Sequence, residues 1–126
     1  MSSPELFLEQ VKLQIGQSRY VLSSTLVREK MEEDAAFYRF RLLLIDGSRL
    51  DASERAEEIN GRLLVTKYSF HWQDTDGQLI ARWDNAAHHL ALPTFPHHIH
   101  DGAEENIQPH PPVSLADVLA EIARRL

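Results

Sequence analysis

The sequence feature that most constrains the fold is a set of three dipeptides that end in glycine: Asp46-Gly47, Asn60-Gly61 and Asp76-Gly77. Tight turns between twisted antiparallel strands need positive φ angles, which Gly, Asn and Asp adopt at the lowest cost. The runs between these turns are rich in β-branched, aromatic and leucine residues, as strands are. The spacing therefore predicts an antiparallel meander over residues 20–85.

Five strands follow from this division of the chain. Their predicted ranges are 20–30, 36–45, 48–58, 62–73 and 78–85. A two-residue loop at Asp46-Gly47 places apolar residues of one strand opposite polar residues of the next, whereas a bulge at Gly47 aligns the apolar residues. We therefore expect a bulged turn there. The pattern leaves the register of the Asn60-Gly61 turn open.

The last hairpin is predicted to have one aromatic and one polar side, because side chains alternate along a strand. The aromatic side holds Tyr68, Phe70, Trp72 and Trp83, and the polar side holds Ser69, His71, Arg82 and Asp84. Large aromatic side chains that share one side favour a place in the core.

An N-terminal helix is predicted over residues 1–16. Ser3 suits the N-cap, Pro4 suits the first helical position, and Gly16 suits the stop. Residues 11–15 also alternate with period two, which leaves a strand as the alternative for that part.

A C-terminal helix is predicted over residues 114–126, because Ser114 and Asp117 form capping signals at its start. The fold class is then α+β: a single antiparallel β-meander of about five strands, with an N-terminal and a C-terminal helix packed on the sheet. The 126 residues, of which 43% are hydrophobic, suit one domain over residues 1–126.

Composition excludes several classes of protein. The absence of cysteine excludes disulfides and thiolate metal sites and favours the reducing cytoplasm. No window is apolar for long enough to span a membrane. The net charge of -6 argues against a general nucleic-acid coat protein, although the Lys and Arg residues of the central half leave local contact with RNA open. The acidic runs at 29–34 and 54–58 are expected to be solvated.

Residues 86–112 show no periodic pattern and are predicted to form a loop rich in histidine and proline. Six of the seven histidines of the chain lie between residues 67 and 100. The prolines and apolar residues among them indicate a loop pinned against the sheet. Loops held in this way often carry the chemistry of a protein.

The strings KYSFHWQD, DNAAHH and LPTFPHHIH, with LIDGSRL upstream and a capped helix at the end, resemble the TumE family. That family is the toxin half of two-gene toxin-antitoxin modules. The resemblance covers residues 36–126, and Phe-Pro-His-His-x-His is its most specific part, whereas Ala87 stands where the family pattern leads us to expect Pro. It implies a toxin with a small helix-turn-helix antitoxin as partner, and it implies no established reaction.

One functional hypothesis is RNA cleavage without a cofactor. Such a reaction needs a base for the 2′-hydroxyl proton, an acid for the leaving oxygen and a cation near the phosphate. Histidine suits both proton transfers because its pKa is near neutrality. The candidate catalytic residues are His71, Arg82, Asp84, His97 and His100. The candidate RNA-binding residues are Lys67, Trp72, Asn85 and Phe95, of which Trp72 or Phe95 would stack on a base.

A second hypothesis is a metal site in the same segment. In an extended chain His98 and His100 point to the same side, so that their imidazoles can share one ion. His88 or His89, together with Asp84, would complete the site. Histidine and carboxylate ligands without cysteine suit zinc, nickel or manganese.

A third hypothesis gives the histidines a structural role. They would satisfy the hydrogen bonds of the loop, and Asp84-Asn85 would only end a strand. The protein would then act by binding a partner. An edge strand over residues 20–30, or an uncovered aromatic ribbon, would support a homodimer or an antitoxin contact.

Overall fold

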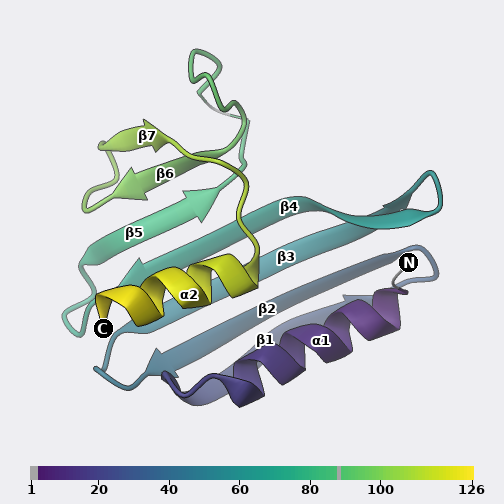
Figure 1. Cartoon of the computed structure of the whole chain (residues 1–126), viewed down its shortest axis with the longest axis horizontal. Helices are drawn as coiled ribbons and strands as arrows, with labels where there is room; N and C mark the ends of the chain where they lie inside the picture. The colour runs from purple at the N-terminus through teal and green to yellow at the C-terminus, as the bar shows by residue number, and fades with distance from the viewer. Residues whose placement is uncertain (1–2, 88) are drawn as a thin grey trace.

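A single antiparallel sheet of seven strands, in the order β1 to β7, forms the centre of the molecule (Figure 1). The computed structural model describes residues 3–87 and 89–126. The elements are α1 (Pro4–Gln17), β1 (Val21–Met31), β2 (Ala35–Leu44), β3 (Arg49–Ile59), β4 (Arg62–Gln73), β5 (Leu79–Asp84), β6 (His98–Asp101), β7 (Ile107–Pro109) and α2 (Leu115–Arg125). The five predicted strands agree with β1 to β5 to within one residue at each end.

The prediction of about five strands was wrong, because the segment predicted as a loop over 86–112 contributes β6 and β7. These strands have four and three residues, too few for a hydrophobic alternation to be visible. β6 reads His-Ile-His-Asp and β7 ends in Pro109, so neither has the composition of a typical strand. The sheet therefore continues beyond the predicted range of 20–85.

The turns follow the predicted chemistry. Gly47 has a φ of 86° and shifts the register, so that Leu42 lies opposite Leu50, which confirms the bulged turn. The turn whose register the sequence left open is a two-residue loop, with φ angles of 52° at Asn60 and 76° at Gly61. Two central residues with positive φ match the twist of antiparallel strands.

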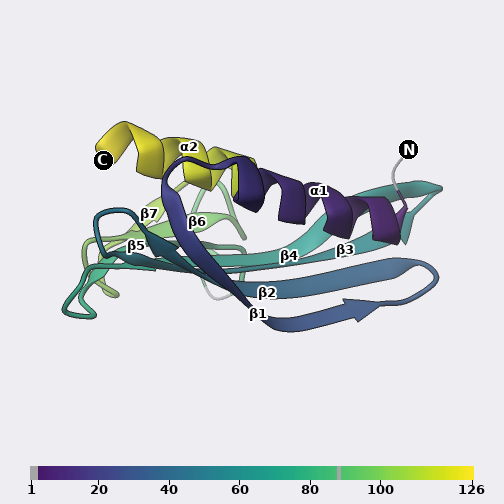
Figure 2. The same cartoon turned by 90° about the horizontal axis from the view of Figure 1, so that it is seen from below.

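Both helices lie on the same side of the sheet (Figure 2). The side chain of Ser3 caps α1 as predicted, but the helix passes Gly16 and ends at Gln17, which also excludes the strand alternative for residues 11–15. Ser114 and Asp117 form the predicted capping box of α2. Within the described part of the chain, no helix has the length and apolar character needed to cross a membrane.

The core lies between the two helices and one face of the sheet. The helices contribute Leu8, Val11, Ile15, Leu115, Val118 and Ile122, and the aromatic side of the β4–β5 hairpin faces them. Tyr68, Phe70, Trp72 and Trp83 are all buried there, as predicted. The opposite face of the sheet points away from both helices, and we call it the open face.

Glu54 departs from the prediction of a solvated acidic run. It is 3% exposed because strand alternation places it on the core face, between Ala52 and Ala56. The hydroxyl of Tyr38 donates a hydrogen bond to its carboxylate at 2.5 Å. Burial raises the pKa of Glu54 to about 7, against the opposing effect of this bond and of the Leu115 backbone N–H.

Candidate functional site

A row of side chains crosses the entire open face, because residues directly opposite on neighbouring strands share a side. The row takes one residue from each strand: Thr25, Arg41, Asp51, His71, Arg82, His100 and Ile107. A neighbouring row contains Ser69, Asp84 and His98. The two rows place Arg82 between His71 and His100, and Asp84 beside His98.

His98 and Asp84 form a buried pair. The distance from His98 Nε2 to Asp84 Oδ1 is 2.9 Å, and the residues are only 1% and 5% exposed. The other ring nitrogen, Nδ1, lies 2.9 Å from the carbonyl oxygen of Pro96. A carbonyl and an ionised carboxylate both only accept hydrogen bonds, so His98 Nδ1–H donates to Pro96 and Nε2–H donates to Asp84.

The tautomer of His100 is set in the same way. Its Nδ1 donates to the carbonyl oxygen of Glu104 at 2.7 Å, and its Nε2 lies 3.1 Å from Arg82 Nη2. A guanidinium only donates, so His100 Nε2 accepts and the ring is neutral. His100 is 4% exposed, so it reaches Arg82 from beneath the surface.

Arg82 is held by three groups. Its Nε donates to Asp84 Oδ2 at 3.1 Å, its Nη1 donates to Glu104 Oε1 at 3.3 Å, and its Nη2 donates to His100. A guanidinium with partners on all three nitrogens has a fixed plane. The arrangement therefore fixes the orientation of one cation on the open face.

His89 completes the cluster from the segment between β5 and β6. One ligand nitrogen from each of His89, His98 and His100 lies within 4.8 Å of the other two. The rings of His89 and His98 pack edge to face, with centroids 4.9 Å apart. His89 is half-buried, unlike the two buried histidines. We call Arg82, Asp84, His89, His98 and His100 the histidine centre.

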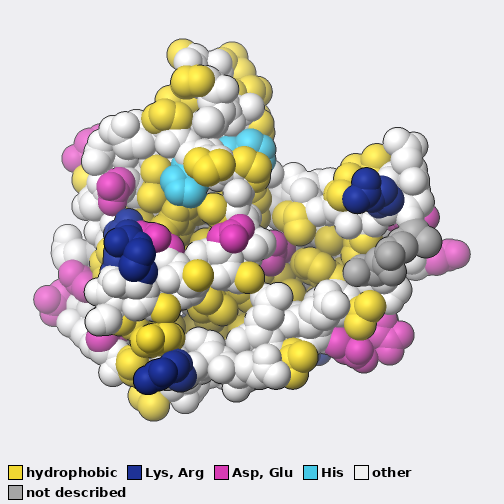
Figure 3. All heavy atoms as spheres, in the orientation of Figure 1, with side chains coloured by type: hydrophobic (Ala, Val, Ile, Leu, Met, Phe, Trp, Pro, Cys, Tyr) yellow, Lys and Arg dark blue, Asp and Glu magenta, His cyan; other side chains and the backbone are white. Residues whose placement is uncertain are grey.

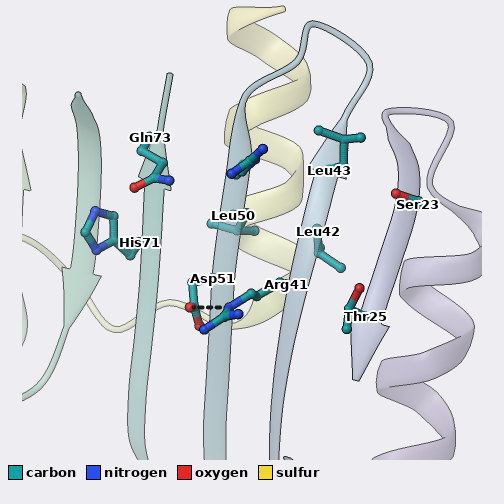
Figure 4. A pocket seen from close by; sticks show the side chains of 10 residues that line it. Ser23, Thr25, Arg41, Leu42, Leu43, Leu50, Asp51, His71 and Gln73 are labelled. Atoms are coloured by element: carbon teal, nitrogen blue, oxygen red, sulfur yellow. Dashed lines mark ion pairs between the residues drawn. The ribbon is translucent and has the colours of Figure 1, made fainter. Parts of the chain in front are cut away.

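His71 lies next to this centre rather than in it. It is half-buried, pairs with Arg82 across β4 and β5, and lines a groove of about 580 Å³ together with Arg41, Asp51 and Gln73 (Figure 4). In the groove, Asp51 receives two hydrogen bonds from Arg39, at 2.9 and 2.8 Å. Burial raises the pKa of Asp51, but the hydrogen bonds and charges of the two arginines outweigh it and leave the pKa below its usual value.

His97 is not brought to the histidine centre. Its ring stacks on Tyr68, with planes 8° apart, and its Nδ1 lies 2.9 Å from the Tyr68 hydroxyl oxygen. Tyr68 belongs to the core side, and histidine side chains are visible on the face that carries the helices (Figure 3). Burial raises the pKa of Tyr68 to about 12.

The residues predicted to bind RNA are scattered. Trp72 is 2% exposed in the core, where its indole N–H donates to Ser48. The Asn85 side chain bonds the backbone of Thr66 and Tyr68, so it extends the β4–β5 ladder. Phe95 is exposed in the segment before β6, and only Lys67 lies on the open face of the sheet.

Some partners could not be foreseen from the sequence. Glu104 and the carbonyl groups of Pro96 and Glu104 fix the tautomers and the arginine, yet no motif marks them. The predicted role of His88 as a metal ligand lies outside the described residues. Of the other predicted ligands, His89, His98, His100 and Asp84 do lie together.

The class defined so far is a small α+β protein with a largely buried polar centre on the sheet face opposite its helices. A family model described as Toxin TumE matches residues 10–126. The chain belongs to the TumE toxin family, and this membership implies an antitoxin as its partner. No curated protein and no solved structure matches the chain.

Proposed function

We propose that this TumE-family toxin acts by cleaving RNA at the histidine centre. The observation that supports the proposal is the cross-strand row in which Arg82 lies between His71 and His100. Arg82 is a fixed cation beside His71, and His89 lies in the same centre. The site therefore offers a phosphate-binding charge and two imidazoles for proton transfer, the groups that phosphodiester transfer needs.

The roles that we propose for the histidines follow their burial. His71 and His89 are half-buried and within reach of a substrate, whereas His98 and His100 are not. In the proposed reaction neutral His71 takes the proton of the 2′-hydroxyl, and the 2′-oxygen attacks the phosphorus. The P–O5′ bond breaks, and protonated His89 gives its proton to the leaving 5′-oxygen. Arg82 stabilises the charge that develops on the phosphate oxygens.

The buried members of the centre act as positioning residues. Asp84 and His100 orient the Arg82 guanidinium. His98 holds Asp84 through Nε2 and is itself held by the Pro96 carbonyl. His97 and Trp72, which face the core side, have no role in the proposed reaction.

The test is cleavage of total RNA by purified protein, with analysis of the product ends. We expect 2′,3′-cyclic phosphate and 5′-hydroxyl ends. His71→Ala should lower the rate by about 100-fold or more while the thermal midpoint stays near the parent's. Ser69→Ala, on the same strand and the same face, is the matched control and should cleave normally. An active His71→Ala protein, or a parent protein that leaves RNA intact, would contradict the proposal.

A second candidate is a divalent metal site, favoured by the orientation of the imidazoles. His98 and His100 each donate Nδ1–H to a carbonyl, which leaves Nε2 directed to a common region near Asp84. Histidine ligands of metals are commonly held by such a bond. Three histidines and a carboxylate fit zinc, nickel or manganese.

A chelator separates the two candidates. Cleavage that persists in EDTA supports acid-base catalysis, and cleavage that is lost in EDTA and restored by zinc supports the metal. Binding of zinc should also raise the thermal midpoint of the chelator-treated protein. His89→Ala should remove that rise, whereas His97→Ala, on the core side, should keep it. A midpoint that does not respond to zinc, nickel or manganese contradicts the metal site.

The remaining parts of the proposal concern partners and location. RNA cleavage places the action of the toxin in the cytoplasm, which the absence of cysteine also favours. A helix-turn-helix protein as the antitoxin, and a homodimer through β1, stay predictions. Copurification with the product of the adjacent gene tests the first, and light scattering of the purified chain tests the second.

A further inference from the structure

The Lys and Arg residues are distributed unevenly over the two faces of the sheet. The chain has thirteen of them, and its net charge is -6. Among the described residues, the strand registers place nine on the open face: Arg28, Lys30, Arg39, Arg41, Arg49, Arg55, Arg62, Lys67 and Arg82. The same registers place three carboxylates there: Asp51, Glu57 and Asp84.

The open face is therefore positive on an acidic protein. Its carboxylates are already paired with its own cations: Asp51 with Arg39 and Arg41, Glu57 with Arg55, and Asp84 with Arg82. Glu32 and Glu104, outside the strands, also pair with Lys30 and Arg82, and the pairs together still leave an excess of positive charge. On the face that carries the helices, Lys and Arg side chains are few and far apart (Figure 3).

The groove on the open face connects this charge to the histidine centre. Ser23, Thr25, Arg41, Arg49 and His71 line it, and they come from β1 to β4 (Figure 4). The cross-strand row continues from His71 to Arg82 and His100. From β2 to β6 the row spans four strand spacings, or about 19 Å.

We propose that the open face from β1 to β5 is a binding track for single-stranded RNA. The track guides the RNA through the groove to Arg82. The inference rests on the proposed function for the identity of the substrate. Charge complementarity selects a polyanion as the occupant. The positive charge follows a groove that ends at a centre of proton-transfer groups. This arrangement suits an RNA strand, because the RNA backbone must lie across the reacting side chains.

Three features select a single strand. A broad sheet face cannot enter the deep and narrow major groove of an RNA helix. Attack by a 2′-oxygen needs an in-line backbone geometry that a flexible strand can adopt. Phe37 lies on the open face with the Arg28 guanidinium 5.8 Å from its ring centroid, a combination that suits stacking with a base.

The test uses a fluorescein-labelled 2′-O-methyl oligouridine of twelve nucleotides, which has no free 2′-hydroxyl and cannot be cleaved. Fluorescence anisotropy gives its Kd at several salt concentrations. The track variant is Arg41→Gln with Arg49→Gln. The matched control is Arg19→Gln with Arg124→Gln, which removes the same charge away from the open face.

We expect the track variant to bind roughly tenfold more weakly, with a salt slope lower by about 1.4 because two phosphate contacts are lost. The control should bind like the parent. Equal losses in the track variant and the control, or no binding by the parent, would overturn the track and leave the face to an acidic protein such as the antitoxin. Because the probe is not cleavable, binding by a parent protein that fails to cleave RNA overturns only the proposed reaction.

Discussion

The two halves of the open face treat charged side chains in opposite ways. In the wide half, formed by the long strands β1 to β4, Asp51 and Arg39 form a pair with side chains 33% and 42% exposed. In the narrow half, formed by the short strands β5 to β7, the Asp84 side chain is only 7% exposed and pairs with Arg82 and His98. The same kind of ion pair is therefore solvated in one half and buried in the other.

The difference indicates which half of the open face contains an energetically costly arrangement of charged side chains. A buried carboxylate loses its hydration and is tolerated only when partners replace the water. Asp84 has such partners, and no described buried side-chain nitrogen or oxygen lacks one. A surface pair such as Asp51 and Arg39 carries little cost and little benefit. The narrow half therefore has the properties of a functional centre, and the wide half those of a binding surface.

The largest expected effect comes from replacing the carboxylates of Asp84 and Asp51 in two separate variants. Asp84→Asn leaves Arg82 and His98 without a buried counter-charge and should lower the free energy of unfolding by about 3 kcal/mol. Asp51→Asn removes a solvated pair and should cost at most about 1 kcal/mol. Urea denaturation of both variants measures the difference. Equal losses would mean that the two halves do not differ in the way described.

A second effect concerns the buried carboxylate on the core face, which has no cationic partner among the described residues. Glu54 is surrounded by the Tyr38 hydroxyl, the Leu115 N–H and the more distant Asp117. Its pKa of about 7 exceeds the usual 4.5, so the folded state favours the protonated form. The stabilisation is complete below pH 4.5 and is lost as the pH rises through 7.

Glu54→Gln should remove this loss. We expect the parent to lose roughly 2 kcal/mol between pH 5 and pH 8, and the variant to lose much less. Glu57→Gln, on the open face of the same strand, is the control and should keep the parent's slope. Unfolding free energies across this pH range test the prediction, and a variant with the parent's slope would contradict it.

The smallest expected effect compares a turn in each half. Gly47 and Gly102 both have positive φ, 86° and 77°, so alanine is strained at either position. A Cβ at Gly47 would also lie 2.8 Å from the Thr75 Cγ2 methyl group, whereas no atom of the described residues would lie within 4 Å of a Cβ at Gly102. Gly47→Ala should therefore cost about 1 kcal/mol more than Gly102→Ala.

Thermal unfolding of the two alanine variants measures this difference. Adding Thr75→Ser removes the methyl group and should bring the cost of Gly47→Ala down to that of Gly102→Ala. If the difference persists in the Thr75→Ser background, the close contact is not its cause.

Much of the wide half was predictable because its signals are local. The glycine turns, the alternation and the Ser114 cap each act within a few residues. The same period of two puts His98 and His100 on one side of a strand and His97 on the other. The hypothesis that joined His97 to His100 as catalytic residues did not take this alternation into account.

The narrow half was less predictable because its pairing is long-range. β6 joins β5 only after the thirteen residues 85–97, and its four residues carry no hydrophobic alternation. The meeting of His89 with His98 and His100, and the hold of Glu104 on Arg82, depend on how that segment returns to the sheet. No spacing rule in the sequence predicts that this segment folds back onto the sheet.

The sequence by itself determined the strand ranges of the meander, its bulged turn, the helix caps and the aromatic side that forms the core. Only the tertiary structure decided that two further strands extend the sheet, which histidines meet, and that the basic residues share one face with them. The physical reason is that turns and alternation are set by neighbouring residues, whereas a polar centre is set by segments that become neighbours only when the chain folds.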